Sequence, residues 1–204
     1  MAFVGMRYAV FAPIKTEVAG QAIEYDAGVV VGRGIGATVN ITRNSEDLYG
    51  DDMLTESDNG IVGGTVDMTV DDMTDKVTEV VLGHVKGANE TQYYEEDAPS
   101  PYGGLGYIRV RRKSGATSYQ ATWIYKAQMA VATETSATKK ESTTWQTTTI
   151  TGKMMGVKNN AEGKTRFRER ETFATEKEAM DWLNAKANIA AAAAAASNTE
   201  FADE

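Results

Sequence analysis

The chain has 204 residues, which suits one domain or one domain with an extension, and a formal net charge of -8 at pH 7. It has no cysteine and one histidine, His84, so disulfides, thiolate catalysis, cysteine-ligated metals and paired-histidine sites are excluded. The acidic balance disfavours a protein that grips nucleic-acid phosphates, and no apolar stretch reaches the ~20 residues that span a bilayer.

Strand-forming segments dominate the N-terminal part of the sequence. Met6–Ala12 predicts a short strand that Pro13 ends. Gly28–Thr42 combines β-branched residues with glycines and predicts one bent strand. Its Gly-Arg-Gly-Ile-Gly run lacks the spacing of a phosphate-binding loop, so we interpret these glycines as relief of crowding. Ser45–Gly60 is acidic and turn-rich, and predicts a long loop of the kind that is often functional.

A strictly alternating strand and a short helix are predicted next. Thr65–Asp71 alternates apolar and polar residues, which is typical of a half-buried strand. Asp72–Gly83 predicts a helix that Asp72 or Thr74 caps at its start and Gly83 closes at its end. The residues expected to face the core are Val66, Met68, Val70, Val77, Val80 and Val81.

The C-terminal half is predicted to return to strands after a polar loop. The loop covers Asn89–Gly104, and strands follow at Tyr107–Arg112 and Tyr119–Val131, with a turn at 114–115 between them. Thr143–Gly152 is rich in threonine, which suits a strand with one face in water. Residues 157–164 are interpreted as a linker before a further strand at Thr165–Phe173.

A C-terminal helix completes the predicted order. Thr175 and Glu178 form a capping box that opens a helix running through Ile189. The order of elements predicts a mainly β protein, a sandwich or barrel with one flanking helix and a C-terminal helix. We expect a β domain over 1–156, a strand and helix over 157–196 that pack on it or on a neighbour, and a flexible acidic tail over 197–204.

Two charged segments are the candidate interaction sites. The acidic loop is interpreted as a solvated loop rather than a calcium site, because it lacks the EF-hand order of ligands, and a contact surface between subunits is the favoured function for it. The basic cluster has three interpretations: a solvated hairpin edge, a patch that binds the acidic loop of a neighbouring copy, or a nucleic-acid site that the net charge opposes. The loop candidates are Glu46, Asp47, Leu48, Tyr49, Asp51, Asp52, Met53 and Leu54, and the basic candidates are Arg109, Arg111, Arg112 and Lys113.

Six segments in this order carry a family resemblance. The first three are an opening strand, an acidic element, and a strand and helix that end in Leu-Gly. The last three are an Ala-Pro entry to a Gly-containing strand, a strand with the pattern Trp-hydrophobic-Tyr-Lys, and a closing Thr-rich strand. The segments are Val4–Phe11, Leu48–Asp52, Gly64–Val70 with Glu79–Gly83, Ala98–Tyr107, Thr122–Met129 and Thr147–Gly152. Together they resemble the major tail protein family of long-tailed bacteriophages.

The resemblance implies a structural protein with no enzymatic activity and no cofactor. Subunits of this family form hexameric rings that stack into a hollow tube, and each contributes strands to a continuous barrel around the lumen. The implied partners are further copies of the chain, the tape-measure protein, the tail-tip and tail-terminator proteins, and double-stranded DNA that passes without specific binding. The expected location is the virion tail, after assembly in the host cytoplasm, with no membrane contact.

Strand alternation then predicts which residues face such a lumen. An acidic lumen would repel phosphate and let DNA slide. The candidates for this face are Asp67, Thr69, Lys126, Gln128, Thr144, Gln146 and Thr148. A slip of one residue in register would move any of them to the other face of the sheet.

Three other functions remain open from the sequence. The first is the tube protein of a contractile tail or a related injection machine. The second is a virion decoration or adhesin β-sandwich that binds a host surface. The third is an enzyme that hydrolyses a glycan with a pair of carboxylates.

Overall fold

The structure is a computed structural model that describes residues 2–50, 53–58, 60–93, 95–113, 115–133 and 147–190. The chain is mainly β, as the sequence predicts, with a large antiparallel sheet and two α-helices. The helices are α1 (Asp75–Leu82) and α2 (Glu176–Lys186), and a short 3-10 helix covers Ala88–Glu90. The strands are β1 (Ala2–Thr16), β2 (Glu24–Tyr25), β3 (Val29–Gly32), β4 (Gly34–Arg43), β5 (Glu46–Gly50), β6 (Met53–Asp58), β7 (Ile61–Val70), β8 (Val85–Lys86), β9 (Gln92–Tyr93), β10 (Tyr102–Lys113), β11 (Ala116–Thr133), β12 (Thr148–Met155) and β13 (Arg168–Phe173).

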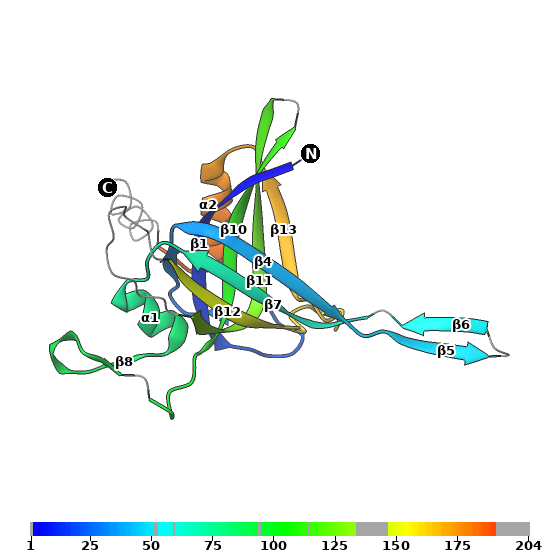
Figure 1. The fold of residues 1–204 in the computed structure, drawn as a ribbon, viewed down its shortest axis with the longest axis horizontal. Helices are drawn as coiled ribbons and strands as arrows, with labels where there is room; N and C mark the ends of the chain where they lie inside the picture. Colours follow the sequence, from blue (N-terminus) through cyan, green and yellow to red (C-terminus); the bar gives the residue numbers. More distant parts are fainter. Residues whose placement is uncertain are drawn as a thin grey trace, which may run out of the picture.

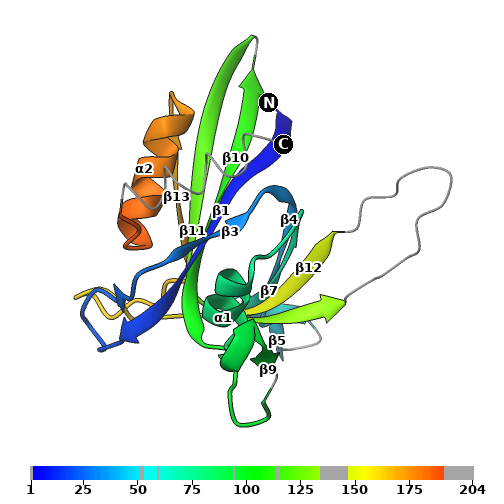
Figure 2. The same ribbon diagram turned by 90° about the vertical axis from the view of Figure 1, so that its left-hand side faces the viewer.

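The main sheet curls until its two ends are joined by the chain itself. Its strand order is β2-β1-β10-β11-β12-β7-β4, with β3 paired to β1 and β13 paired to β11. Only Arg33 separates β3, which pairs with β1, from β4, which pairs with β7. Gly32 makes this step possible, because its φ of 148° suits glycine and a Cβ there would meet the Asp72 carbonyl oxygen. The sheet therefore surrounds a core in the manner of a barrel (Figures 1 and 2).

Two hydrophobic clusters lie on opposite faces of β1, β10 and β11. Along β1, Ala9 and Phe11 face the barrel interior while Val10 and Ala12 face α2, as the two-residue period of a strand requires. Helix α1 contributes three buried residues to the interior, and α2 packs against the outside of the same strands (Figure 2). The residues of α1 and α2 in these clusters are Val77, Val81, Leu82, Ala179 and Leu183.

An irregularity in β11 lets this one strand serve two parts of the fold. Gly103 pairs with Ala127 and Leu105 pairs with Ile124, so β11 has an extra residue between these two pairs. Ile124 and Ala127 consequently both belong to the interior cluster, while Tyr125 belongs to the cluster under α2. The first half of β11 pairs with β10 and β13, and its second half pairs with β12.

Several predicted elements are confirmed. Val66, Met68 and Val70 are fully buried in β7. Helix α1 ends at Gly83, which adopts the left-handed conformation as predicted. At its start the N-cap position is Thr74, but the Thr74 side chain makes no capping hydrogen bond, so the predicted side-chain cap is wrong. The capping box of α2 is complete, because the Thr175 hydroxyl accepts from the Glu178 N–H and the Glu178 carboxylate accepts from the Thr175 N–H.

Other expectations about element boundaries are wrong. The segment Ser45–Gly60, predicted to be a loop, contains a β-hairpin of β5 and β6. The acidic, turn-rich composition gave no indication of this strand pairing. Pro13 does not end β1: it pairs with Gly103 of β10, its carbonyl accepts from the Asp26 N–H at 2.9 Å, and the strand continues to Thr16.

Three further boundaries differ from the sequence expectation. The predicted strand 28–42 is two strands, β3 and β4, that pair with different partners. The predicted loop 89–104 contains β9, and β10 already begins at Tyr102. Helix α2 ends at Lys186, three residues before Ile189, because Asn188 adopts a positive φ of 52°.

Candidate functional site

A polar face covers the outside of β4, β7, β12 and the second half of β11. Since Val66, Met68 and Val70 point into the core, their neighbours Asp67 and Thr69 point outward. Hydrogen bonds link the strands across this face: Asp67 Oδ1 accepts from Thr151 Oγ1 at 2.8 Å, and Thr69 Oγ1 lies 3.2 Å from Thr149 Oγ1. We call this surface the polar sheet face; its members are Thr38, Asn40, Thr42, Thr65, Asp67, Thr69, Lys126, Gln128, Thr149, Thr151 and Lys153.

The structure separates the residues predicted to face a lumen. Asp67, Thr69, Lys126 and Gln128 share the polar sheet face. Thr148 does not: it pairs with Val70 and has the alternation of Ile150, which is buried, so it lies on the core side. The sequence register for β12 was therefore off by one residue. Thr144 and Gln146 lie outside the described residues.

The polar sheet face is rich in hydroxyl groups. The sequence led us to expect an acidic surface here, and this face is not acidic. Its only described carboxylate is that of Asp67, and Lys153 is exposed beside it. Lys126 pairs with Glu17 at 2.5 Å, and Gln128 Nε2 donates to the Ser100 carbonyl at 2.9 Å. The strand positions that alternate outward carry mainly threonine, and the acidic residues of this region lie in the hairpin instead.

The β5–β6 hairpin extends β4 and β7 away from the body of the molecule (Figure 1). Its register sets Glu46 directly opposite Asp58 and Leu48 opposite Glu56. No lysine or arginine occurs between these positions in the sequence. Of the predicted contact residues, Glu46, Asp47, Leu48 and Tyr49 lie in β5, and Met53 and Leu54 lie in β6. Asp51 and Asp52 lie outside the described residues.

The predicted basic cluster is divided between the two sides of the sheet. Arg109 and Arg111 have the alternation of Tyr107, which faces the barrel interior, whereas Arg112 points to the opposite side. Lys113 ends β10 at the exposed tip of the β10–β11 hairpin. The four residues are therefore not one patch.

Two arginines of β13 join the first side, and sequence reasoning missed them. Thr122 pairs with Arg170 and Ile124 pairs with Arg168, so both arginines lie on the same side of the sheet as Arg109. The signal was present in the Arg-Glu-Arg-Glu run from Arg168, because alternation sorts opposite charges onto opposite faces of a strand. We call Phe3, Arg109, Arg111, Arg168 and Arg170 the arginine face.

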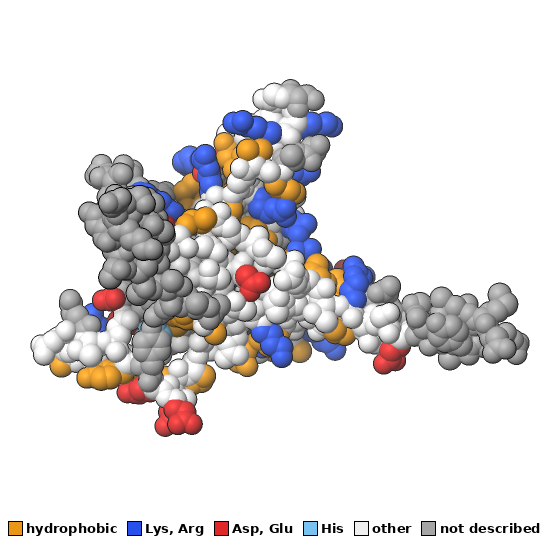
Figure 3. Space-filling model, viewed as in Figure 1, with side chains coloured by type: hydrophobic (Ala, Val, Ile, Leu, Met, Phe, Trp, Pro, Cys, Tyr) orange, Lys and Arg blue, Asp and Glu red, His pale blue; other side chains and the backbone are white. Residues whose placement is uncertain are grey.

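Two members of the arginine face lie over one aromatic ring. The Arg109 guanidinium carbon lies 3.4 Å from the centre of the Phe3 ring, and that of Arg111 lies 5.5 Å from it. Burial, followed by the charge of Arg170, lowers the pKa of Arg168. Figure 3 shows Lys and Arg side chains gathered over β13 and the upper parts of β10 and β11.

The other side of β13 is tied to α2. Glu169 pairs with Lys186 of α2 at 2.5 Å and accepts a hydrogen bond of 2.6 Å from the Tyr125 hydroxyl. Burial and this carboxylate raise the pKa of Tyr125 to about 12. The Glu169 carboxylate thus helps to hold α2 on the body, while Arg168 and Arg170 lie on the opposite side of β13.

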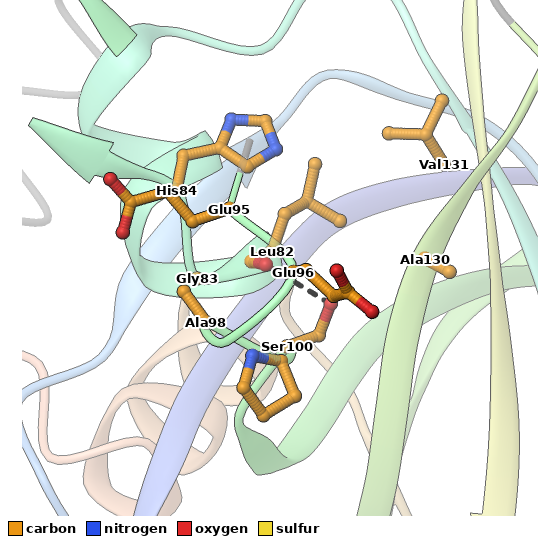
Figure 4. Close-up of a pocket in the computed structure, with 10 residues that line it drawn as sticks. Leu82, Gly83, His84, Glu95, Glu96, Ala98, Ser100, Ala130 and Val131 are labelled. Atoms are coloured by element: carbon orange, nitrogen blue, oxygen red, sulfur yellow. Dashed lines mark hydrogen bonds between the residues drawn. The ribbon is translucent and has the colours of Figure 1, made fainter. Parts of the chain in front are cut away.

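A recess beside the end of α1 contains the only histidine of the sequence (Figure 4). His84 Nδ1 lies 3.3 Å from Gln92 Oε1, and Glu95 and Glu96 line the same recess. The Ser100 hydroxyl donates to the Leu82 carbonyl at 3.0 Å, which satisfies a carbonyl at the end of α1. In the described residues no group of three metal-ligating side chains is close enough to hold an ion.

No helix within the described ranges has the length and apolar character needed to cross a membrane. Comparison with protein-family models and with curated proteins finds no match for this chain.

Proposed function

We propose that this chain is the subunit of a bacteriophage tail tube, in which rings of six copies stack around a lumen that conducts the genome. The observation that carries the proposal is the joint position of the hairpin and the polar sheet face. The β5–β6 hairpin is a direct extension of β4 and β7, two of the strands that carry that face. A hairpin that leaves the body from such strands can reach a neighbouring copy while the face itself stays in water.

The composition of the polar sheet face supports its assignment to the lumen. Hydroxyl and amide side chains are hydrated, and they offer passing DNA few of the cations on which phosphate binding depends. Threonine also favours the extended backbone that a tube wall requires. On this proposal Asp67, Thr69 and Thr151 line the channel and Val66 and Met68 hold the wall on its core side.

Ring closure would also account for the outer edge of β13. This strand pairs with β11 on one side, and no other described strand of the main sheet lies beside it. A row of unpaired backbone groups is a template for a strand from another molecule. In a ring, a strand of the adjacent subunit would occupy this edge and make the barrel continuous between copies.

Negative-stain electron microscopy of the purified protein over a series of concentrations tests the proposal. We expect rings at low concentration and hollow tubes at high concentration, with mass photometry giving multiples of six subunits. A protein that stays monomeric or trimeric throughout the series, and that binds host cells in that state, would contradict the proposal in favour of a decoration or adhesin domain.

A further inference from the structure

Three arginines of the arginine face have no carboxylate partner in the part of the chain that the structure describes. No carboxylate there lies at ion-pair distance from Arg109, Arg168 or Arg170. The neighbouring glutamates of β13 point to the other side of the sheet, where Glu169 is engaged by Lys186. Phe3 lies at the β1 end of this surface and is 45% exposed. A concentration of like charge on one side of a sheet favours an anionic partner.

The β5–β6 hairpin has the opposite excess. The register places Glu46 opposite Asp58, and residues 46–58 contain six carboxylates and no lysine or arginine. The hairpin points away from the part of the sheet that carries the arginine face (Figure 1), so the two surfaces of one chain do not meet. The chain thus has two surfaces of opposite charge that can meet only between copies.

We propose that the arginine face of one copy receives the acidic β5–β6 hairpin of a second copy. This inference rests on the proposed function, which it deepens by naming the two surfaces that meet. A second copy is favoured as the occupant because its own segment 46–58 supplies six carboxylates and no lysine or arginine, which complements the arginines. Guanidinium groups also bind carboxylates through two parallel hydrogen bonds, which sets orientation as well as charge.

The absence of cysteine allows a direct test with engineered pairs that leave every charge in place. Ser57→Cys marks the hairpin in one chain, and Thr172→Cys marks the arginine face in a second chain that has a larger tag. Thr172 is exposed on β13, two residues after Arg170 and on the same side. The matched control is Thr117→Cys, which is also exposed but lies on the reverse side of the sheet, opposite Arg112.

Dilute mixtures are oxidised mildly and the disulfide-linked heterodimer is measured on a non-reducing gel. We expect several times more heterodimer with Thr172→Cys than with Thr117→Cys, and a yield that falls as salt is added because exposed charges are screened. Adding Arg170→Glu to the Thr172→Cys chain should lower the yield on the order of threefold. Equal yields from the two cysteine positions, or a yield that Arg170→Glu leaves unchanged, would overturn the inference.

A second arm tests nucleic acid as the occupant. If a short DNA duplex is retarded by the wild-type chain and not by Arg170→Glu, and cross-linking shows no preference, the arginine face binds nucleic acid and the inference fails. The outcomes also separate the two proposals. If rings or tubes form but cross-linking shows no preference for Thr172→Cys, the tube proposal is retained and the contact between the hairpin and the arginine face is rejected. Preferential cross-linking without rings would keep the contact and count against the tube.

Discussion

At the scale of single residues, a chain of hydrogen bonds joins β2 to the centre of the sheet. Trp123 Nε1 donates to the Tyr25 hydroxyl at 3.3 Å, and that hydroxyl donates to the Tyr125 carbonyl at 2.8 Å. The Tyr25 and Trp123 rings meet edge to face with centroids 5.2 Å apart. Burial raises the pKa of Tyr25 well above its usual range and that of Tyr125 to about 12. The folded state therefore holds both phenols neutral.

This network predicts a loss of stability at high pH. Below pH 10 both phenols are neutral in the folded and in the unfolded chain. Above pH 10 the phenols ionise first in the unfolded chain, where their pKa is lower. The free energy of unfolding therefore falls as the pH rises toward 12. Tyr25→Phe should cost about 1–3 kcal/mol at neutral pH, because it leaves the Trp123 N–H without its acceptor, and should make the fall at high pH shallower. Denaturant unfolding at pH 8 and above pH 10 measures both effects. Tyr93→Phe, at an exposed position, serves as the control, and an equal pH dependence in all three proteins would contradict the prediction.

Two glycines on paired strands give a second test at this scale. A Cβ on Gly64 of β7 would overlap the Asn40 carbonyl oxygen and the end of Met154, whereas a Cβ on Gly36 of β4 meets nothing within 4 Å. We expect Gly64→Ala to destabilise the fold by about 1–3 kcal/mol and Gly36→Ala to change it by less than about 1 kcal/mol. Chemical denaturation of the two variants checks this, and equal effects would show that β4 and β7 are not packed as described.

At the scale of elements, α2 is held to the sheet by its first turn and by its buried side. Its capping box satisfies two backbone N–H groups, and Arg7 of β1 pairs with Glu176 at 2.7 Å. On the buried side, the Tyr8 hydroxyl donates to Asn184 Oδ1 at 2.7 Å. Desolvation raises the pKa of Tyr8, which keeps this hydroxyl a donor.

Loss of the cap should therefore destabilise the whole chain by a measurable amount. Thr175→Ala removes the acceptor of the Glu178 N–H, and we expect it to cost about 1 kcal/mol, whereas Thr175→Ser should retain most of the stability. Thermal unfolding followed by circular dichroism compares the three proteins. If the alanine variant melts with the wild type, α2 does not contribute to the cooperative fold.

At the scale of the whole molecule, the body and the hairpin have separate tasks. The pairing of β4 with β7 continues outward to Arg43 and Ile61, and the Asn44 N–H donates to the Gly60 carbonyl at 2.8 Å. The backbone pairing of the body therefore continues to the root of the hairpin.

Replacing residues 46–58 by Asn-Gly should separate assembly from folding. A two-residue turn of this type joins antiparallel strands directly, so we expect the melting temperature to stay within a few degrees of the wild type. Rings and tubes should disappear, because the segment that reaches a neighbouring copy is gone. Electron microscopy and a melting curve on the same sample decide the matter: normal tubes from the shortened chain would exclude the hairpin from assembly.

Local signals in the sequence were enough for the elements that one segment specifies alone. The alternation around Val66, the left-handed Gly83 and the Thr175 capping box all act within a few residues, and all three are present in the structure. Mistakes arose where pairing partners decide the outcome. The acidic hairpin was predicted to be a loop because its strands are defined by their pairing with each other, which composition does not reveal. The register of β12 likewise depends on its pairing with β7 and β11.

By itself, the sequence determined a mainly β fold, its two helices and the absence of cysteine chemistry, because composition and periodicity are properties of the chain before it folds. Only the tertiary structure decided which charges come together. Arg109 and Arg168 lie 59 positions apart in the chain, and both become members of one surface because β10 and β13 pair with opposite edges of β11. Strand pairing over that distance is set by the packing of the whole core, which no short window of residues contains.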